Sequence, residues 1–111
     1  MNAVVSPRPV DARRPQAAIQ TLRRSFVVNL AHGLHARPCA VLVKNLQPYR
    51  LIVEVEVNGE RASGKSILGL MSLGAAYGST ITFTMTGEDA FEAMAKVENI
   101  FFTNFEAAYH A

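Results

Sequence analysis

The sequence predicts an α+β fold: a four-stranded antiparallel sheet covered on one face by three helices, in the order β-α-β-β-α-β-α. Residues 51–57 and 79–87 alternate apolar and polar side chains, as strands with one buried and one exposed face do. Apolar residues at helical spacing lie between and after these segments. The length of 111 residues suits one compact domain. We therefore expect an open-faced sandwich.

The first strand and the first helix are expected close to the N-terminal third of the chain. Order should begin near Arg24, with a strand at residues 25–30. A helix should follow over residues 36–47. Pro38 is tolerated in its first turn, because that turn has no intrahelical N–H bond to lose, and Pro48 ends it.

A hairpin and a short helix should occupy the middle of the chain. Asn58-Gly59 is the strongest short-range hairpin signal, and it predicts a return strand at residues 60–62. Ser66 suits the N-cap of the next helix, and Gly74 suits the position just past its end.

The last strand, residues 79–87, should lead into a long C-terminal helix. Asp89 and Glu92 resemble a capping box at its start. Several large or apolar residues follow at roughly helical spacing: Phe91, Met94, Ala95, Phe101 and Phe105. The aromatic residues Phe101, Phe102, Phe105 and Tyr109 cannot all fit one buried stripe. We expect them to contact the N-terminal extension or a second copy of the chain.

Charge divides the chain near its N-terminus. Residues 1–25 contain five arginines against one aspartate, whereas residues 26–111 contain six basic and eight acidic residues. The folded part is mildly acidic, which argues against nucleic acid as a partner, because a nucleic-acid-binding domain concentrates Lys and Arg on its folded face. We divide the chain into a flexible Arg- and Pro-containing extension, residues 1–23, and one domain, residues 24–111.

The composition also bears on location. No apolar run approaches the roughly 18–20 residues that span a bilayer, so we expect no membrane insertion. Residues 1–25 lack the apolar block of a secretory signal, although an Arg-rich, acid-poor segment is also compatible with a transit peptide. Cys39 is the only cysteine, so no intramolecular disulfide can form, and we expect a cytoplasmic protein.

The stretch NLAHGLHARPC places His35 and Arg37 where the first helix begins. Neutral imidazole is a nucleophile near neutral pH and can form a labile phosphoramidate. A helix start adds unpaired backbone N–H groups and a positive dipole end, both of which favour a dianionic group. Arg37 offers a planar fork of donors to phosphate oxygens. Gly33 permits the tight turn into this corner.

Other interpretations of these residues stay open on residue chemistry alone. A histidine near a helix start is commonly a cap or a surface residue. His32 and His35 could form half of a metal site, but no Cys, Asp or Glu stands nearby to complete the shell, and we predict no metal. Cys39 is expected to pack inside the helix, since a catalytic Cys–His pair would lack a supporting third group.

Two motifs together are similar to one family. GLHARP at residues 33–38 and GKSILGLMSLG at residues 64–74 resemble HPr, the histidine-containing phosphocarrier of the phosphoenolpyruvate-dependent phosphotransferase system, over residues 25–105. The resemblance implies an HPr-like open-faced sandwich in which His35 accepts phosphate on Nδ1 from phosphorylated enzyme I and donates it to a IIA-type component. It implies that Arg37 and first-turn amides stabilise the phosphoryl group, and that Ser66 is the regulatory serine phosphorylated by HPr kinase/phosphorylase.

The resemblance also implies a docking surface for enzyme I and IIA components. We expect Ile67, Leu68 and Met71 to form an apolar patch beside Ser66, with Lys44 as a further docking residue; part of this patch could instead be core. Leu70 and Leu73 should face inward.

These implications define a phosphoryl carrier rather than a turnover enzyme, without a cofactor and expected to be monomeric. The alternative is a mainly regulatory HPr-like protein, nitrogen-linked or a co-regulator, not coupled to sugar uptake. A small-molecule-binding module without covalent chemistry would need a pocket, and the sequence offers no Gly-rich loop or polar cluster besides the one at His35.

Overall fold

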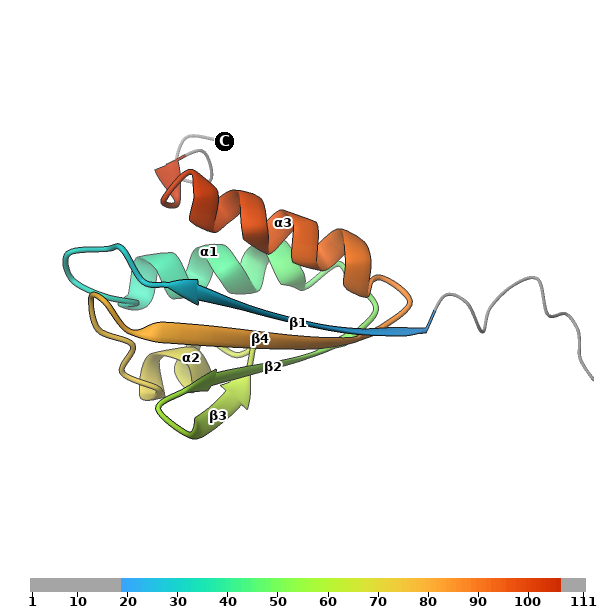
Figure 1. Ribbon diagram of the computed structural model, residues 1–111, viewed down its shortest axis with the longest axis horizontal. Helices are drawn as coiled ribbons and strands as arrows, with labels where there is room; N and C mark the ends of the chain where they lie inside the picture. Colours follow the sequence, from blue (N-terminus) through green and yellow to red (C-terminus); the bar gives the residue numbers. More distant parts are fainter. Residues whose placement is uncertain (1–18, 107–111) are drawn as a thin grey trace, which may run out of the picture.

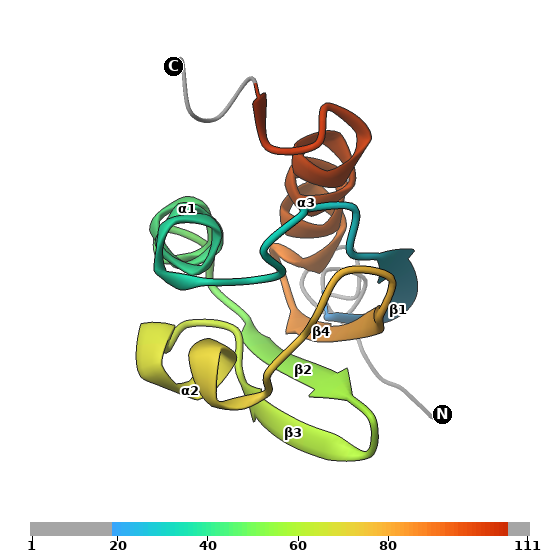
Figure 2. The same ribbon diagram turned by 90° about the vertical axis from the view of Figure 1, so that its left-hand side faces the viewer.

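The computed structural model describes residues 19–106, which form four strands and three helices in the predicted order (Figure 1). In chain order they are β1 (Gln20–Val27), α1 (Ala36–Leu46), β2 (Ile52–Val57), β3 (Glu60–Ser63), α2 (Ile67–Ser72), β4 (Thr80–Gly87) and α3 (Ala90–Phe102). The strands form one antiparallel sheet with the order β1-β4-β2-β3. All three helices lie on one face of this sheet (Figure 2). The predicted α+β open-faced sandwich is confirmed.

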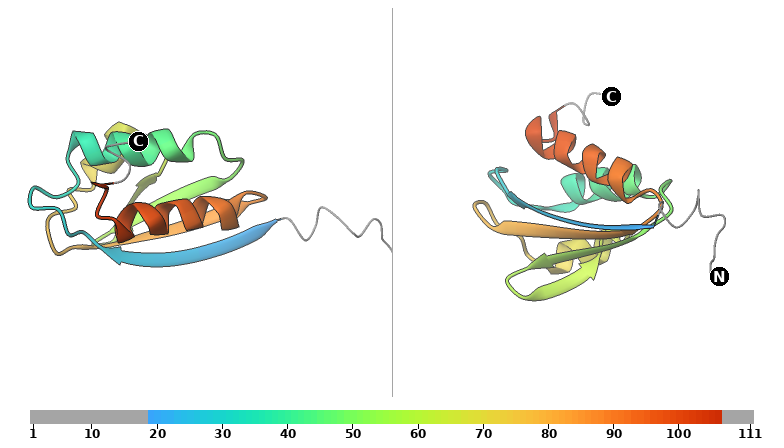
Figure 3. Two further views of the ribbon diagram at one scale, coloured as in Figure 1. Left: turned by 90° about the horizontal axis from the view of Figure 1, so that it is seen from above. Right: turned by 45° about the vertical axis from the view of Figure 1, so that its right-hand side comes forward.

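The hydrophobic core lies between the inner face of the sheet and the helices. The alternation in β2 and β4 holds, because one set of side chains is buried on both strands: Val53, Val55, Val57, Ile81, Phe83 and Met85. Helix α1 adds Leu42 and Leu46 to this core. Viewed from above, α1 and α3 lie side by side over the sheet (Figure 3). Burial of each large apolar side chain contributes about 1.5–3 kcal/mol, so this packing fixes where each helix begins and ends.

The first strand starts earlier than the sequence predicted. β1 spans Gln20–Val27 rather than residues 25–30. It pairs with β4 along its whole length, from Gln20 opposite Gly87 to Val27 opposite Thr80. The sheet therefore includes residues 20–23, which we had assigned to the extension. Residues 1–18 of that extension, and Tyr109 of the aromatic tail, lie outside the described residues.

Arg24 explains why the start of β1 was missed. It lies between Leu22 and Phe26 on the side of the strand that faces α3, where an apolar residue would have continued the alternation. The guanidinium is accommodated there because its Nε donates to Glu98 Oε2 on α3 over 3.0 Å. Both side chains are about half exposed, so solvent screens this ion pair and its contribution to stability is small.

The predicted capping box at the start of α3 is wrong. Asp89 is the N-cap, but its side chain makes no capping hydrogen bond. Its Oδ2 instead accepts from the backbone N–H of Arg50 over 2.7 Å and lies 3.5 Å from the Arg50 Nε. That backbone hydrogen bond, together with the charge of Arg50, lowers the pKa of Asp89 below its usual range. Asp89 thus ties the start of α3 to the turn before β2.

Helix α3 buries only part of the predicted apolar set: Met94 is buried, whereas Phe91 and Ala95 are exposed. Its buried residues are Ala90, Ala93, Met94, Val97 and Ile100. Phe91 is exposed, as is Phe102 at 88 % of its side-chain surface. Phe101 stacks on Phe26 of β1 with ring centroids 4.6 Å apart, and Phe105 is buried. Phe26, Phe83, Phe101 and Phe105 therefore pack on one another within the domain, whereas Phe91, Phe102 and Tyr77 are exposed.

Candidate functional site

The corner between β1 and α1 is held by backbone hydrogen bonds to the loop that follows α2. The N–H of Leu34 donates to Ala75 O over 2.8 Å, and the N–H of Val28 donates to Ser79 O over 2.9 Å. Gly33 has a φ of +70°, and a Cβ there would lie 2.5 Å from the same Ala75 carbonyl oxygen. Glycine is required at this position both for its left-handed backbone and for this close approach. The two loops meet at one end of the molecule (Figure 2).

His35 is the N-cap of α1, and its imidazole is exposed. The backbone is extended, with φ −84° and ψ −168°, and the carbonyl oxygen accepts from Cys39 N–H over 3.1 Å. The side chain makes no capping hydrogen bond. The His35 backbone therefore starts the helix while its ring stays accessible to another protein. The prediction that α1 begins at this corner is correct.

The first turn of α1, which directly follows His35, contains a positively charged residue and backbone N–H donors. Arg37 is exposed in this turn. Pro38 is buried and has no N–H, so the first-turn amides after the cap are those of Ala36 and Arg37. The helix of 11 residues directs the positive end of its dipole toward the same place. This arrangement favours a dianionic group attached to His35.

Cys39 is a core residue, as predicted. It is fully buried, and its Sγ donates weakly to Leu34 O over 3.4 Å. Burial raises the pKa of the Cys39 thiol to about 11. The thiol therefore keeps its proton at neutral pH and cannot act as a nucleophile beside His35.

His32 lies close to His35 on the same loop. Their ring centroids are 6.3 Å apart, and the ring planes are inclined by 77°. Both residues are exposed. Among residues 19–106, no three His, Cys, Asp or Glu side chains gather in a group that could hold a metal ion. From the sequence, this pair was considered only as possible metal ligands. The proximity of the two rings could not be predicted, because a spacing of three residues in a loop does not determine the distance between two side chains.

Ser66 caps α2, as predicted. Its Oγ accepts from the Gly69 N–H over 2.9 Å, and the residue is half-buried. The three expected patch residues, Ile67, Leu68 and Met71, are all exposed, by 39, 79 and 40 %. On the opposite side of this helix, Leu70 and Leu73 are buried, as expected. The apolar surface beside Ser66 is therefore distinct from the core.

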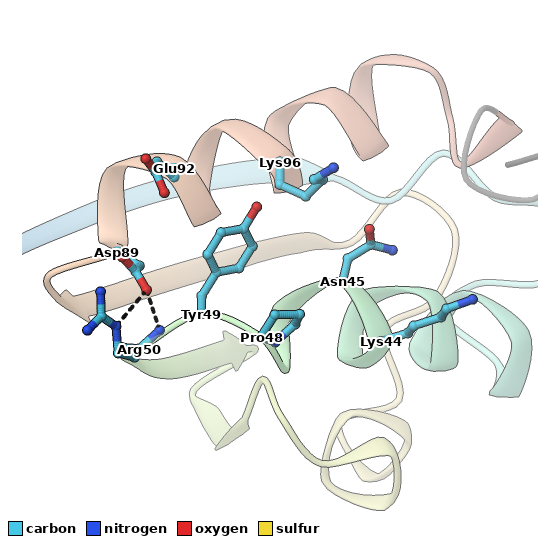
Figure 4. Close-up of a pocket in the computed structure, with 8 residues that line it drawn as sticks. All are labelled: Lys44, Asn45, Pro48, Tyr49, Arg50, Asp89, Glu92 and Lys96. Atoms are coloured by element: carbon cyan, nitrogen blue, oxygen red, sulfur yellow. Dashed lines mark hydrogen bonds and ion pairs between the residues drawn. The ribbon is translucent and has the colours of Figure 1, made fainter.

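Lys44 lies in the last turn of α1, away from the patch on α2. It lines a groove of about 510 Å³ between α1, the turn before β2 and the start of α3 (Figure 4). The groove residues are Lys44, Asn45, Pro48, Tyr49, Arg50, Asp89, Glu92 and Lys96. Neither His35 nor the patch on α2 contributes to it. This groove could not be predicted from the sequence, because its walls come from segments about forty residues apart in the chain.

No helix within residues 19–106 has the length and apolar character needed to cross a bilayer.

Comparison with known proteins agrees with this geometry. A family model described as "PTS HPr component phosphorylation site" matches residues 22–102. The HPr-like protein Crh of Halalkalibacterium halodurans is 43 % identical over 73 residues, which cover 66 % of this chain and 87 % of the relative.

Solved structures give the same assignment. HPr-C-His from Thermoanaerobacter tengcongensis superposes with a TM-score of 0.72 at 28 % identity, covering 76 % of this chain and 94 % of that one. Crh of Bacillus subtilis superposes with a TM-score of 0.58 at 35 % identity, covering 72 and 91 %, and is described as a domain-swapped, intertwined dimer. The match spans β1 to α3 and includes the corner at His35, so the chain belongs to the HPr family of phosphocarrier proteins.

Proposed function

We propose that this protein relays a phosphoryl group through His35, from phosphorylated enzyme I to IIA-type components of the phosphotransferase system. The observation that supports this most directly is the state of the His35 side chain. It caps α1 through its backbone alone, and its exposed ring makes no capping hydrogen bond. A carrier needs a nucleophile that two different proteins can reach in turn, and a ring bonded into the helix start would not serve.

Transfer to His35 is a displacement at phosphorus. The lone pair of one imidazole nitrogen, Nδ1 by analogy with the family, forms a bond to the phosphorus of the donor's phosphohistidine. The N–P bond of the donor breaks, and its electron pair stays on the departing imidazole. The PO₃ group then carries its negative charge beside the guanidinium of Arg37 and the positive end of α1, which stabilise it. The step toward a IIA-type component is the same displacement with His35 as the leaving group.

Partner docking is assigned to the exposed apolar patch on α2, together with Lys44. Ile67, Leu68 and Met71 present apolar surface that the core does not use. Phosphorylation of Ser66 by HPr kinase/phosphorylase would place a charge of about −1.5 to −2 next to this patch. That charge is compatible with the N-terminus of α2, so the helix stays folded. It opposes docking of an acidic partner through repulsion and desolvation, which would make Ser66 a regulatory site.

The relay is tested by incubating the protein with enzyme I and phosphoenolpyruvate and mapping the acid-labile phosphate. We expect one phosphate on His35 in the wild type and none in His35→Ala. Circular dichroism should show both proteins folded, because the exposed ring makes no capping hydrogen bond. His32→Ala is the matched control and should still accept phosphate at His35. Undiminished incorporation in His35→Ala, or none in the wild type, would refute the proposal.

A mainly regulatory function, without coupling to sugar uptake, is the second candidate. It is favoured by the match to proteins described as HPr-like protein Crh, of which the Bacillus subtilis structure is also described as a catabolite repression protein. Onward transfer decides between the two functions. A relay passes phosphate from His35 to a IIA-type component, whereas a regulator retains it. For the relay we expect the protein to be a cytoplasmic monomer. Sedimentation would distinguish this monomer from a dimer like that of Bacillus subtilis Crh.

A further inference from the structure

Two exposed imidazoles, those of His32 and His35, are neighbours at the β1–α1 corner. His32 and His35 flank the segment that contains Gly33 and Leu34. The N–H of Gly33 donates to Leu30 O, and the N–H of Leu34 donates to Ala75 O, each over 2.8 Å. These bonds restrain the backbone segment that carries both rings, whose centroids lie 6.3 Å apart.

With ring centroids 6.3 Å apart, the two imidazoles are neighbours but are not hydrogen-bonded to each other. A hydrogen bond joins nitrogen and oxygen atoms about 2.9 Å apart. A PO₃ group bound to a nitrogen of His35 extends outward from the ring and brings its oxygens toward the neighbouring imidazole. Neither ring is buried, so both can turn to accept this geometry.

We propose that His32 is a positioning residue that donates an N–H to an oxygen of the phosphoryl group carried by His35; this rests on the proposed function. No atom is transferred in this step: His32 keeps its proton, and the N–P bond on His35 is unchanged. The hydrogen bond stabilises the phosphorylated form more than the free form, because only the former presents an anionic acceptor. The effect is stronger when His32 is an imidazolium, since a charged donor binds a charged acceptor more tightly.

Other charged or titratable residues on the segments around this corner are Arg37 on α1, Tyr77 on the loop after α2, and Glu106 after α3. Imidazole is the side-chain type that ordinarily changes charge between about pH 5 and 8. Replacing His32 alone leaves the other residues in place. Any pH dependence of the phosphoryl-exchange equilibrium that is lost when His32 is replaced can therefore be assigned to His32.

The test measures the equilibrium of phosphoryl exchange between enzyme I and this protein from pH 6 to pH 8, using wild type, His32→Gln and His32→Ala. We expect the equilibrium constant toward phospho-His35 to fall about threefold to tenfold in His32→Ala. The deficit should be larger at pH 6 than at pH 8. His32→Gln, which keeps an N–H donor but no charge, should lie near the wild type at pH 8 and below it at pH 6. Asn29→Ala, an exposed residue of the same loop, is the control and should leave the equilibrium unchanged.

The outcomes separate this inference from the proposed function. Phosphate on His35 with equal equilibrium constants for all three proteins at every pH would refute the role of His32 alone. A uniform loss that does not vary with pH, with Gln no better than Ala, would also refute it, because a merely structural change at the loop behaves that way. Absence of phosphate on His35 in the wild type would refute both.

Discussion

The replacement Gly33→Ala tests whether the His35 corner is held by the close contact between two loops. Gly33 has φ +70°, where a residue other than glycine is disfavoured by about 1–2 kcal/mol. The new Cβ would lie 2.5 Å from Ala75 O, which must then move. That movement weakens the hydrogen bond from Leu34 N–H to the same oxygen, a bond that contributes about 0.5–1.5 kcal/mol. We expect a total destabilisation of about 1.5–3.5 kcal/mol, measured by urea denaturation followed by circular dichroism.

Gly59→Ala provides the matched control. Gly59 also has positive φ, at +83°, but no atom lies within 4 Å of the position of its Cβ. It should lose only the backbone contribution, about 1–2 kcal/mol. Phosphorylation of His35 should slow in Gly33→Ala and stay unchanged in Gly59→Ala. Equal losses of stability in the two variants would show that the contact with Ala75 does not hold the corner.

Two further replacements address the α2 cap and the buried thiol. Ser66→Ala removes the acceptor for Gly69 N–H and should lower the free energy of unfolding by about 1 kcal/mol. Ser66→Asp keeps an acceptor and should stay close to wild-type stability, but it should bind enzyme I more weakly. Equal affinity of wild type, Ala and Asp in a titration would contradict the switch. Cys39 has a pKa raised to about 11, so the folded state holds its proton after the unfolded state has released it. Relative to Cys39→Ala, the wild type should keep its stability below about pH 8.5 and lose about 2–3 kcal/mol as the pH rises toward 11; parallel denaturation profiles between pH 8 and 11 would contradict this.

Local signals in the sequence were sufficient for the elements that local chemistry determines. Asn58 and Gly59 both have positive φ, at 52° and 83°, which is why this pair predicts the hairpin between β2 and β3. Ser66 caps α2 through the expected side-chain bond. Two motifs together predicted His35 as the functional histidine at a helix start, and the structure places it at the N-cap of α1.

The features that were missed depend on contacts between distant segments. Arg24 lies on the same side of β1 as Leu22 and Phe26, and its charge is paired there with Glu98 of α3. Asp89 accepts from Arg50, a residue 39 positions away, in preference to the start of its own helix. No local pattern contains this information.

The prediction for α3 was wrong at Phe91 because size was mistaken for burial. Phe91 is larger and more apolar than Ala90 or Ala93, yet the two alanines are buried and the phenylalanine is exposed. Small residues let the start of the helix approach the sheet closely, and both alanines are fully buried there.

The same balance between local preference and tertiary contact explains the corner at His35. A helix start is normally stabilised by Ser, Thr, Asp or Asn at the N-cap, by about 1 kcal/mol, and the side chain of His35 makes no such bond. Burial of Pro38 and Cys39 against the core compensates for it, since each carries apolar surface out of water in the first turn. A side-chain cap at position 35 would add stability and occupy the donors that an anion uses. On the proposed function, a phosphoryl oxygen carried by His35 would take that acceptor role, and the helix start would be completed in the phosphorylated form.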